Sequence, residues 1–195
     1  EEGASADFHA VKRYASLREF SALKLVYERN SSSVVKLQYN GSTDTTYQYL
    51  PATNNITQRV WTGRFTEASF KFNKTEGLRV LGVSMEDTTG VVVDNFSLRG
   101  NSGLILEQLD QPRCEALNVI RKYDLIVLQY GLNVVSDEVL QYGWYRQRMV
   151  HVLAHVRQCF PDADILLLGV SDRSRQEEGT FQTMPAVLAL LHAQR

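Results

Sequence analysis

Three polar, glycine-bearing segments carry the residue types that bind and polarise a ligand. Their glycines let the backbone approach a bound molecule closely. Their amide side chains and backbone N–H groups can donate hydrogen bonds to a ligand oxygen that gains negative charge. The segments span residues 94–103, 130–133 and 169–174. They indicate one binding site, provided that the fold brings them together.

The second half of the chain predicts the elements that would position these segments. Apolar runs such as Val91-Val92-Val93 are typical of strands buried on both faces. The predicted elements are a strand Gly90–Asp94, a helix Gly103–Lys122, a strand Asp124–Tyr130, a helix Asp137–Phe160, a strand Asp164–Val170 and a helix Thr183–Gln194. This alternation favours an α/β fold with a parallel sheet. Ligands bind at the carboxyl ends of such strands, where all three polar segments begin.

The first half of the chain, residues 15–89, predicts an antiparallel β-sandwich that precedes an α/β domain of residues 90–195. Alternating apolar residues and an Asn40-Gly41 turn are typical of hairpins. The predicted strands are Phe20–Arg29, Val35–Tyr39, Thr45–Leu50, Arg59–Phe65, Ala68–Phe72 and Leu78–Met85. Seven aromatic residues are candidates for a sugar-stacking platform, although we expect most to lie in the core: Tyr39, Tyr47, Tyr49, Trp61, Phe65, Phe70 and Phe72.

The composition narrows the class of protein. The chain has 195 residues, 44% of them hydrophobic and 22% charged, with a formal net charge of −1. These values are ordinary for a globular protein, and the balanced charge predicts neither a nucleic acid nor an acidic membrane as partner. No apolar run reaches the length of a membrane span. Cys114 and Cys159 are too few for a disulfide framework, so we predict two reduced thiols, no metal and no cofactor.

The polar segments and their strands also carry a family resemblance. Residues 91–103 resemble the second conserved block of SGNH hydrolases, the GDSL-type esterases. Residues 123–133 resemble the third block, whose Gly-x-Asn corresponds to Gly131-Leu132-Asn133. Residues 169–174 and 179–185 are similar to the region after the next strand. The order and spacing of these motifs, rather than any one of them, carry the resemblance.

The resemblance implies part of a flavodoxin-like fold, with helices on both faces of a parallel sheet, and an enzyme that hydrolyses acyl esters. In this family a backbone N–H of the second block and the Asn side chain of the third help to form the oxyanion hole. Those positions are Gly100 and Asn133 here, and they are the expected catalytic residues. Asn101, Asp172 and Arg173 are the expected substrate contacts, with an Asp172–Arg173 ion pair as an equal alternative. Losing one oxyanion donor typically raises the barrier by about 2.7–4 kcal/mol.

Two other blocks of the family are missing from this sequence. The nucleophile of the family is the Ser of a Gly-Asp-Ser block and the base is the His of an Asp-x-x-His block, and neither pattern occurs in the chain. The β-rich half is similar to a carbohydrate-binding-like insert found in a subgroup that includes bacterial peptidoglycan O-acetylesterases. The resemblance therefore implies a segment of a carbohydrate O-acetylesterase that is inactive alone, because without the triad only a residual rate remains.

Several alternatives stay open at this stage. The chain is a fragment, a split-gene product or a degenerate homologue, and it either associates with a complementing chain or self-associates. A periplasmic, cell-surface or secreted location follows from the resemblance. A non-catalytic glycan-binding protein is the alternative function, whereas a nucleotide binder is disfavoured because both glycine-rich phosphate motifs are missing.

Two further pairs of side chains are candidates to replace the missing triad. His151 and His155 have the i, i+4 spacing of a metal pair on a helix, but no glutamate lies between them to act as a base. Ser171 and Ser174 lie at the expected edge without the sequence of a nucleophile elbow. We therefore expect neither pair to perform catalysis.

Overall fold

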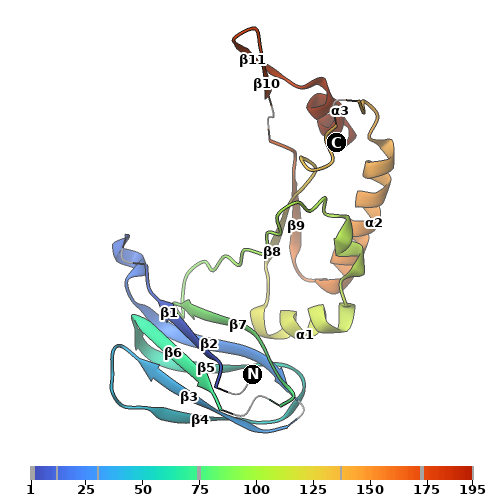
Figure 1. Cartoon of the computed structure of the whole chain (residues 1–195). Helices are drawn as coiled ribbons and strands as arrows, with labels where there is room; N and C mark the ends of the chain where they lie inside the picture. The colour runs from blue at the N-terminus through green and yellow to red at the C-terminus, as the bar shows by residue number, and fades with distance from the viewer. Residues whose placement is uncertain are drawn as a thin grey trace. The chain divides into compact units, whose positions relative to one another are not determined.

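The computed structural model describes residues 3–11, 13–29, 31–73, 76–136, 138–171 and 174–194. The chain divides into two compact units, Glu1–Asp94 and Asn95–Arg195, and each is described by itself (Figure 1). The first unit is built from antiparallel sheets. The second contains three α-helices and a parallel pair of strands within its described residues. The protein is therefore mixed α/β.

The first unit consists of two antiparallel sheets. The four-stranded sheet has the order β1 (Ser5–His9), β6 (Glu67–Phe72), β3 (Ser33–Tyr39) and β4 (Thr46–Leu50). The three-stranded sheet has the order β5 (Thr53–Phe65), β2 (Phe20–Arg29) and β7 (Leu78–Glu86), and a short 3-10 turn, η1 (Ala15–Leu17), precedes β2. Asn40 and Gly41 both have positive φ, as the turn between β3 and β4 requires, which confirms the predicted hairpin.

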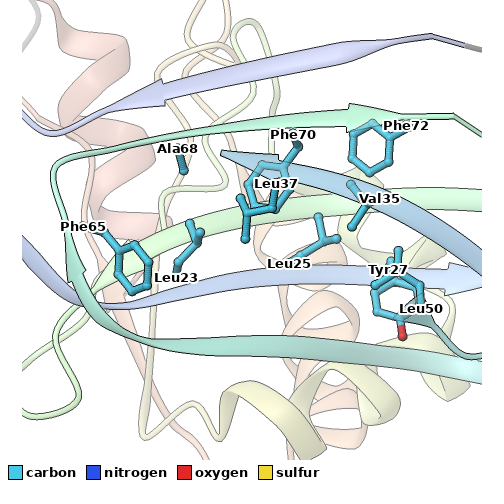
Figure 2. Close-up of a cluster of buried hydrophobic side chains, with 10 residues drawn as sticks. All are labelled: Leu23, Leu25, Tyr27, Val35, Leu37, Leu50, Phe65, Ala68, Phe70 and Phe72. Atoms are coloured by element: carbon cyan, nitrogen blue, oxygen red, sulfur yellow. The ribbon is translucent and has the colours of Figure 1, made fainter. Parts of the chain in front are cut away.

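The two sheets enclose one hydrophobic core, shown in Figure 2. In β3, Val35 and Leu37 are buried, whereas Val34 and Lys36 on the alternate positions are not. The cluster comprises Leu23, Leu25, Tyr27, Val35, Leu37, Leu50, Phe65, Ala68, Phe70 and Phe72. Each large side chain removed from water contributes about 1.5–3 kcal/mol, so this alternation stabilises the sheet pair and fixes which face of each strand points inward.

The core separates the aromatic residues into two groups. Phe65, Phe70 and Phe72 are buried, and the ring centroids of Phe70 and Phe72 lie 6.4 Å apart in a stacked arrangement. Trp61 is partly buried against the same cluster. Tyr47 and Tyr49, on β4, are exposed over 66% and 59% of their surfaces. Tyr39 is also exposed and packs edge-on against Phe65, with 5.4 Å between the centroids.

The second unit packs its helices and turns around the parallel pair β8 (Leu125–Gln129) and β9 (Asp164–Leu168). Helix α2 (Gly143–Cys159) lies beside this pair (Figure 1). It buries Tyr145, Met149, Val152 and Val156 at helical spacing against one face of the pair. The remaining elements are η2 (Leu104–Gln108), α1 (Gln111–Arg121), the hairpin β10 (Ser174–Glu177) with β11 (Thr180–Thr183), and α3 (Pro185–Ala193).

The predicted strand Gly90–Asp94 is wrong. These residues form no strand, and Val91 and Val93 are exposed over 94% and 84% of their surfaces. In a flavodoxin-like sheet the second strand pairs with the first strand rather than with the third. The described residues place no such first strand beside 90–94, so the segment has no ladder to join. Among the described residues the parallel sheet consists of β8 and β9, and they show no wider flavodoxin-like sheet.

All three predicted helices begin later than expected, α3 by only two residues and the other two by more. The helix predicted from Gly103 begins as a 3-10 turn, and α1 itself begins at Gln111. There the Asp110 carboxylate accepts a hydrogen bond from the Arg113 N–H at 3.0 Å, and Pro112 occupies the first turn. The helix predicted from Asp137 begins at Gly143. Strand β1 was not predicted, and the hairpin β10–β11 lies where loops were expected.

Candidate functional site

The ends of β8 and β9 are joined by one side chain, that of Gln194. Its Nε2 donates to the Tyr130 carbonyl oxygen at 2.9 Å, and its Oε1 accepts from the Val170 N–H at 3.2 Å. Tyr130 directly follows β8, and Val170 is the second residue after β9. Gln194 directly follows α3, so its two hydrogen bonds connect the end of this helix to the loops after both strands. Sequence reasoning missed it, because a glutamine at a helix end has no distinctive spacing.

Asn133 connects the loop after β8 to the segment that precedes η2. Its Nδ2 donates to the Asn101 carbonyl oxygen at 2.8 Å, across 32 positions of sequence. The turn that places Asn133 starts at Gly131, whose φ is +124°. A Cβ atom at Gly131 would lie 2.6 Å from Cγ1 of Val170, so the loop after β8 and the loop after β9 touch at a point where only glycine fits.

Residues 98–103 form a turn segment with hydrogen bonds of its own. The Asn101 Oδ1 accepts from the Gly103 N–H at 2.6 Å, and the Asn101 N–H donates to the Leu98 carbonyl at 3.3 Å. Gly100 and Gly103 both have positive φ, of 77° and 88°. A Cβ atom at Gly103 would lie 2.7 Å from the Tyr130 ring, so this turn lies directly against the residue that follows β8.

Tyr145 of α2 holds the same turn from the other side. Its hydroxyl donates to the Ser102 carbonyl oxygen at 2.8 Å, and its side chain is fully buried. Burial raises the pKa of Tyr145 to about 12, with a smaller contribution from Tyr130, so the hydroxyl stays protonated and keeps donating at neutral pH. Sequence reasoning identified Tyr145 only as one apolar position of the helix, because its hydrogen bond depends on tertiary contact.

The structure brings three of the five predicted site residues together. Gly100, Asn101 and Asn133 lie in one turn-and-loop cluster, with Asn133 and Gly100 exposed and Asn101 half-buried. Asp172 and Arg173 lie outside the described residues. The cluster presents amide donors at an open surface beside the ends of β8 and β9, an arrangement that can hold an oxygen bearing partial negative charge.

The other candidate side chains have local roles. Nε2 of His155 lies 2.8 Å from the Leu109 carbonyl oxygen and 3.7 Å from Sγ of Cys159. A proton on Nε2 that satisfies this carbonyl prevents the same nitrogen from binding a metal, and His151 is exposed. Among the described residues, no group of three His, Cys, Asp or Glu side chains is placed to hold a metal ion. Ser171 is exposed, and Ser174 begins β10.

Comparison with known proteins supports an esterase-like fold. No family model and no curated protein matches the chain. A solved structure of a peptidoglycan O-acetylesterase matches with a TM-score of 0.54 and 14% identity, over 99% of this chain and 52% of that chain. The chain therefore spans about half the length of that esterase, and the two share a fold over this stretch.

Two further solved structures, both of carbohydrate esterases from family two, match with lower TM-scores. The enzyme from Clostridium thermocellum, solved in complex with cellohexaose, has a TM-score of 0.31 and 10% identity, over 91% of this chain and 74% of that chain. The enzyme from Cellvibrio japonicus has a TM-score of 0.31 and 11% identity, over 100% of this chain and 76% of that chain.

None of the helices in the described residues is long and apolar enough to cross a membrane.

Proposed function

We propose that this chain is a segment of an SGNH-family esterase that removes acyl groups, most specifically O-acetyl groups, from a carbohydrate. The observation that carries the proposal is the hydrogen bond between Asn133 Nδ2 and the Asn101 carbonyl at the carboxyl ends of β8 and β9. It supports an assembled oxyanion side, with an amide side chain held next to a glycine turn. The esterase-like fold of the whole chain agrees with this proposal.

In this proposal Gly100 and Asn133 are the donors that stabilise the tetrahedral intermediate. An amide group has two N–H donors, and Asn133 uses one of them to hold the Asn101 carbonyl. The second would donate to the oxyanion, together with the backbone N–H of Gly100. The bond to Asn101 fixes the amide before substrate arrives, so no reorganisation is needed when charge develops. Asn101, Asp172 and Arg173 would contact the sugar.

The nucleophile and the base must come from a complementing polypeptide segment that carries the Gly-Asp-Ser and Asp-x-x-His blocks. One face of the parallel pair is available to receive it. Val127 and Leu166 alternate with residues that pack on α2, and both are exposed. These apolar surfaces match what an additional parallel strand and its helix would cover.

The experiment measures hydrolysis of 4-nitrophenyl acetate and acetylated xylan with and without that complementing segment, supplied from the flanking coding sequence. We expect no hydrolysis above buffer and no fluorophosphonate labelling for the chain alone. We expect activity when both segments are present, and a loss of about 10²–10³ in kcat for Asn133→Asp, which removes the amide donor without changing its size.

The matched control is Asn95→Asp, an exposed asparagine whose Oδ1 accepts from the Ser97 N–H at 2.9 Å. An aspartate keeps that oxygen, so activity should not change. Fluorophosphonate labelling of a serine in this chain would contradict the proposed absence of a nucleophile. Equal activity of Asn133→Asp and the unchanged protein would overturn the role of Asn133.

A further inference from the structure

The four-stranded sheet has an outward face that the hydrophobic core does not explain. Because Val35 and Leu37 point into the core, the alternate residues of β3, Lys36 and Gln38, lie on the opposite face. By the same alternation Tyr47 and Tyr49 of β4 lie on this face. We call these four residues, together with Asp7, Ser69 and Lys71 of β1 and β6, the outer sheet face.

Strand register places two lysines side by side on the outer sheet face. Lys36 of β3 is directly opposite Lys71 of β6, and Tyr47 of β4 is opposite Lys36 on its other side. Directly opposite side chains have Cβ atoms about 4.5–5.5 Å apart, and like charges in that position destabilise a sheet. The ion pairs found among the described residues include neither lysine. The arrangement therefore favours an anion bound between them.

The two tyrosines supply flat apolar surfaces next to this positive charge. They lie two positions apart on β4, which is the end strand of its sheet, so their Cα atoms are about 7 Å apart along the strand. Both rings are more than half exposed. A tyrosine ring offers a rigid surface at low entropic cost, and such rings stack against the C–H faces of pyranose sugars.

Hydrogen-bonding groups continue across the outer sheet face. Gln38, Ser69 and Asp7 form the next row of directly opposite residues, and they line a hollow of about 250 Å³ together with Glu67 and residues of the β3–β4 turn. The face thus combines stacking surfaces, a paired positive charge and a row of amide, hydroxyl and carboxylate groups. A sugar with hydroxyls and a carboxylate satisfies all three.

We propose that the outer sheet face binds an anionic polysaccharide, with the carboxylate of a uronate-type sugar between Lys36 and Lys71 and neighbouring rings on Tyr47 and Tyr49. This site is separate from the cluster around Asn133 and does not depend on that cluster being catalytic. It would hold the chain on a carboxylate-bearing glycan whether or not the chain acts on that glycan.

The test is calorimetric titration of the complete chain with hexagalacturonate, cellohexaose and poly-L-glutamate of matched charge. We expect hexagalacturonate to bind at least about tenfold more tightly than either of the others, because only it offers both rings and carboxylates. The affinity for hexagalacturonate should fall about tenfold in each of the variants Lys36→Gln and Lys71→Gln, because each loses a charge-assisted hydrogen bond. Tyr47→Ala should lower the affinity for both hexagalacturonate and cellohexaose.

The matched controls are Tyr14→Ala and Arg59→Gln, an exposed tyrosine and an exposed arginine outside the outer sheet face, and neither should change binding. Circular dichroism checks that each variant is folded. Undetectable hexagalacturonate binding overturns the proposal. Equal binding of poly-L-glutamate overturns it in favour of simple charge attraction, and equal binding of cellohexaose overturns the role of the lysines. Binding that survives both Lys36→Gln and Tyr47→Ala also overturns it.

Discussion

Tyr145 is the residue on which the geometry of the candidate site most depends, because its hydroxyl is fully buried and holds the turn that carries Gly100 and Asn101. The hydroxyl donates to the Ser102 carbonyl at 2.8 Å. Asn133 holds the Asn101 carbonyl and Tyr145 holds the adjacent Ser102 carbonyl, so the turn keeps its donors fixed without help from a ligand. Individual hydrogen bonds, rather than ion pairs, therefore fix the geometry of the candidate site.

Tyr145→Phe tests that dependence. Removing the hydroxyl leaves the Ser102 carbonyl without this donor, so we expect the free energy of unfolding to fall by about 0.5–1.5 kcal/mol in urea titration. In the complemented enzyme kcat should fall as well, since the turn is less firmly held. Tyr14→Phe, at an exposed tyrosine, is the control and should change neither value. An unchanged stability of Tyr145→Phe would show that the hydrogen bond contributes nothing.

Cys114 gives a prediction on pH. Burial, with a contribution from nearby Cys159, raises the pKa of Cys114 to about 12. A raised pKa means that the folded thiol holds its proton above the unfolded value of about 8.5. The neutral Cys114 thiol therefore makes its full contribution to stability below a pH of about 8.5, and this contribution is lost as the pH rises toward 12.

Two measurements check the prediction for Cys114. Iodoacetamide labelling followed by mass mapping should be slow at this thiol at pH 8 in the native state and fast in urea, because the thiolate is the nucleophile. Between pH 8.5 and 10, Cys114→Ala should lose less stability than the unchanged protein does. Rapid native labelling of Cys114 at pH 8 would show that the thiol is not held in its neutral form.

At the scale of elements, cross-strand pairs decide how each sheet is stabilised. Lys24 of β2 lies directly opposite Ser84 of β7. It forms an ion pair with Glu86, which lies two positions further along β7 and is buried. On the four-stranded sheet, Lys36 and Lys71 oppose each other instead. Two antiparallel sheets of the same unit thus use lysine in opposite electrostatic settings.

This contrast predicts opposite effects for the same substitution. Lys36→Gln removes a like-charge contact, so the free energy of unfolding should rise by about 0.2–1 kcal/mol without ligand. Lys24→Gln removes the ion pair between Lys24 and the buried Glu86 carboxylate, so the free energy of unfolding should fall. Chemical denaturation in low salt measures both. A loss of stability in Lys36→Gln would contradict the unfavourable pairing on which the glycan site partly rests.

At the scale of the whole molecule, the described residues of the second unit leave part of one sheet face exposed within that unit. Val127 and Leu166 are exposed on the face of β8–β9 opposite to α2. Exposed apolar strands with an unpaired edge favour association with another chain. The complementing segment proposed above would cover the same surface, so the two kinds of association should compete.

We therefore predict that the chain alone self-associates in a concentration-dependent way in sedimentation experiments. Val127→Lys should abolish this association, because a lysine on the exposed face disfavours burial against another chain. Val119→Lys, at an exposed valine of α1, is the matched control and should leave it unchanged. A monodisperse monomer at all concentrations would contradict the prediction.

Much of the local structure could be predicted because it follows from periodicity. The predicted strand Phe20–Arg29 coincides with β2, and Tyr145, Met149, Val152 and Val156 form the buried face of α2 as their spacing indicates. Burial of alternate residues in strands and of every third or fourth residue in helices depends on the neighbouring sequence alone. Pairing partners depend on distant residues, and this is why Gly90–Asp94 was wrongly predicted as a strand.

The sequence by itself determined the mixed α/β character of the chain and the inward-facing residues of most elements. Only the tertiary structure decided that Tyr47 and Tyr49 face water while Phe70 and Phe72 do not, and that Lys36 opposes Lys71. It also supplied Tyr145 and Gln194 as the side chains that hold the site. The reason is physical: periodicity specifies which face of an element is buried, whereas register and long-range hydrogen bonds are set by the partner strand or helix.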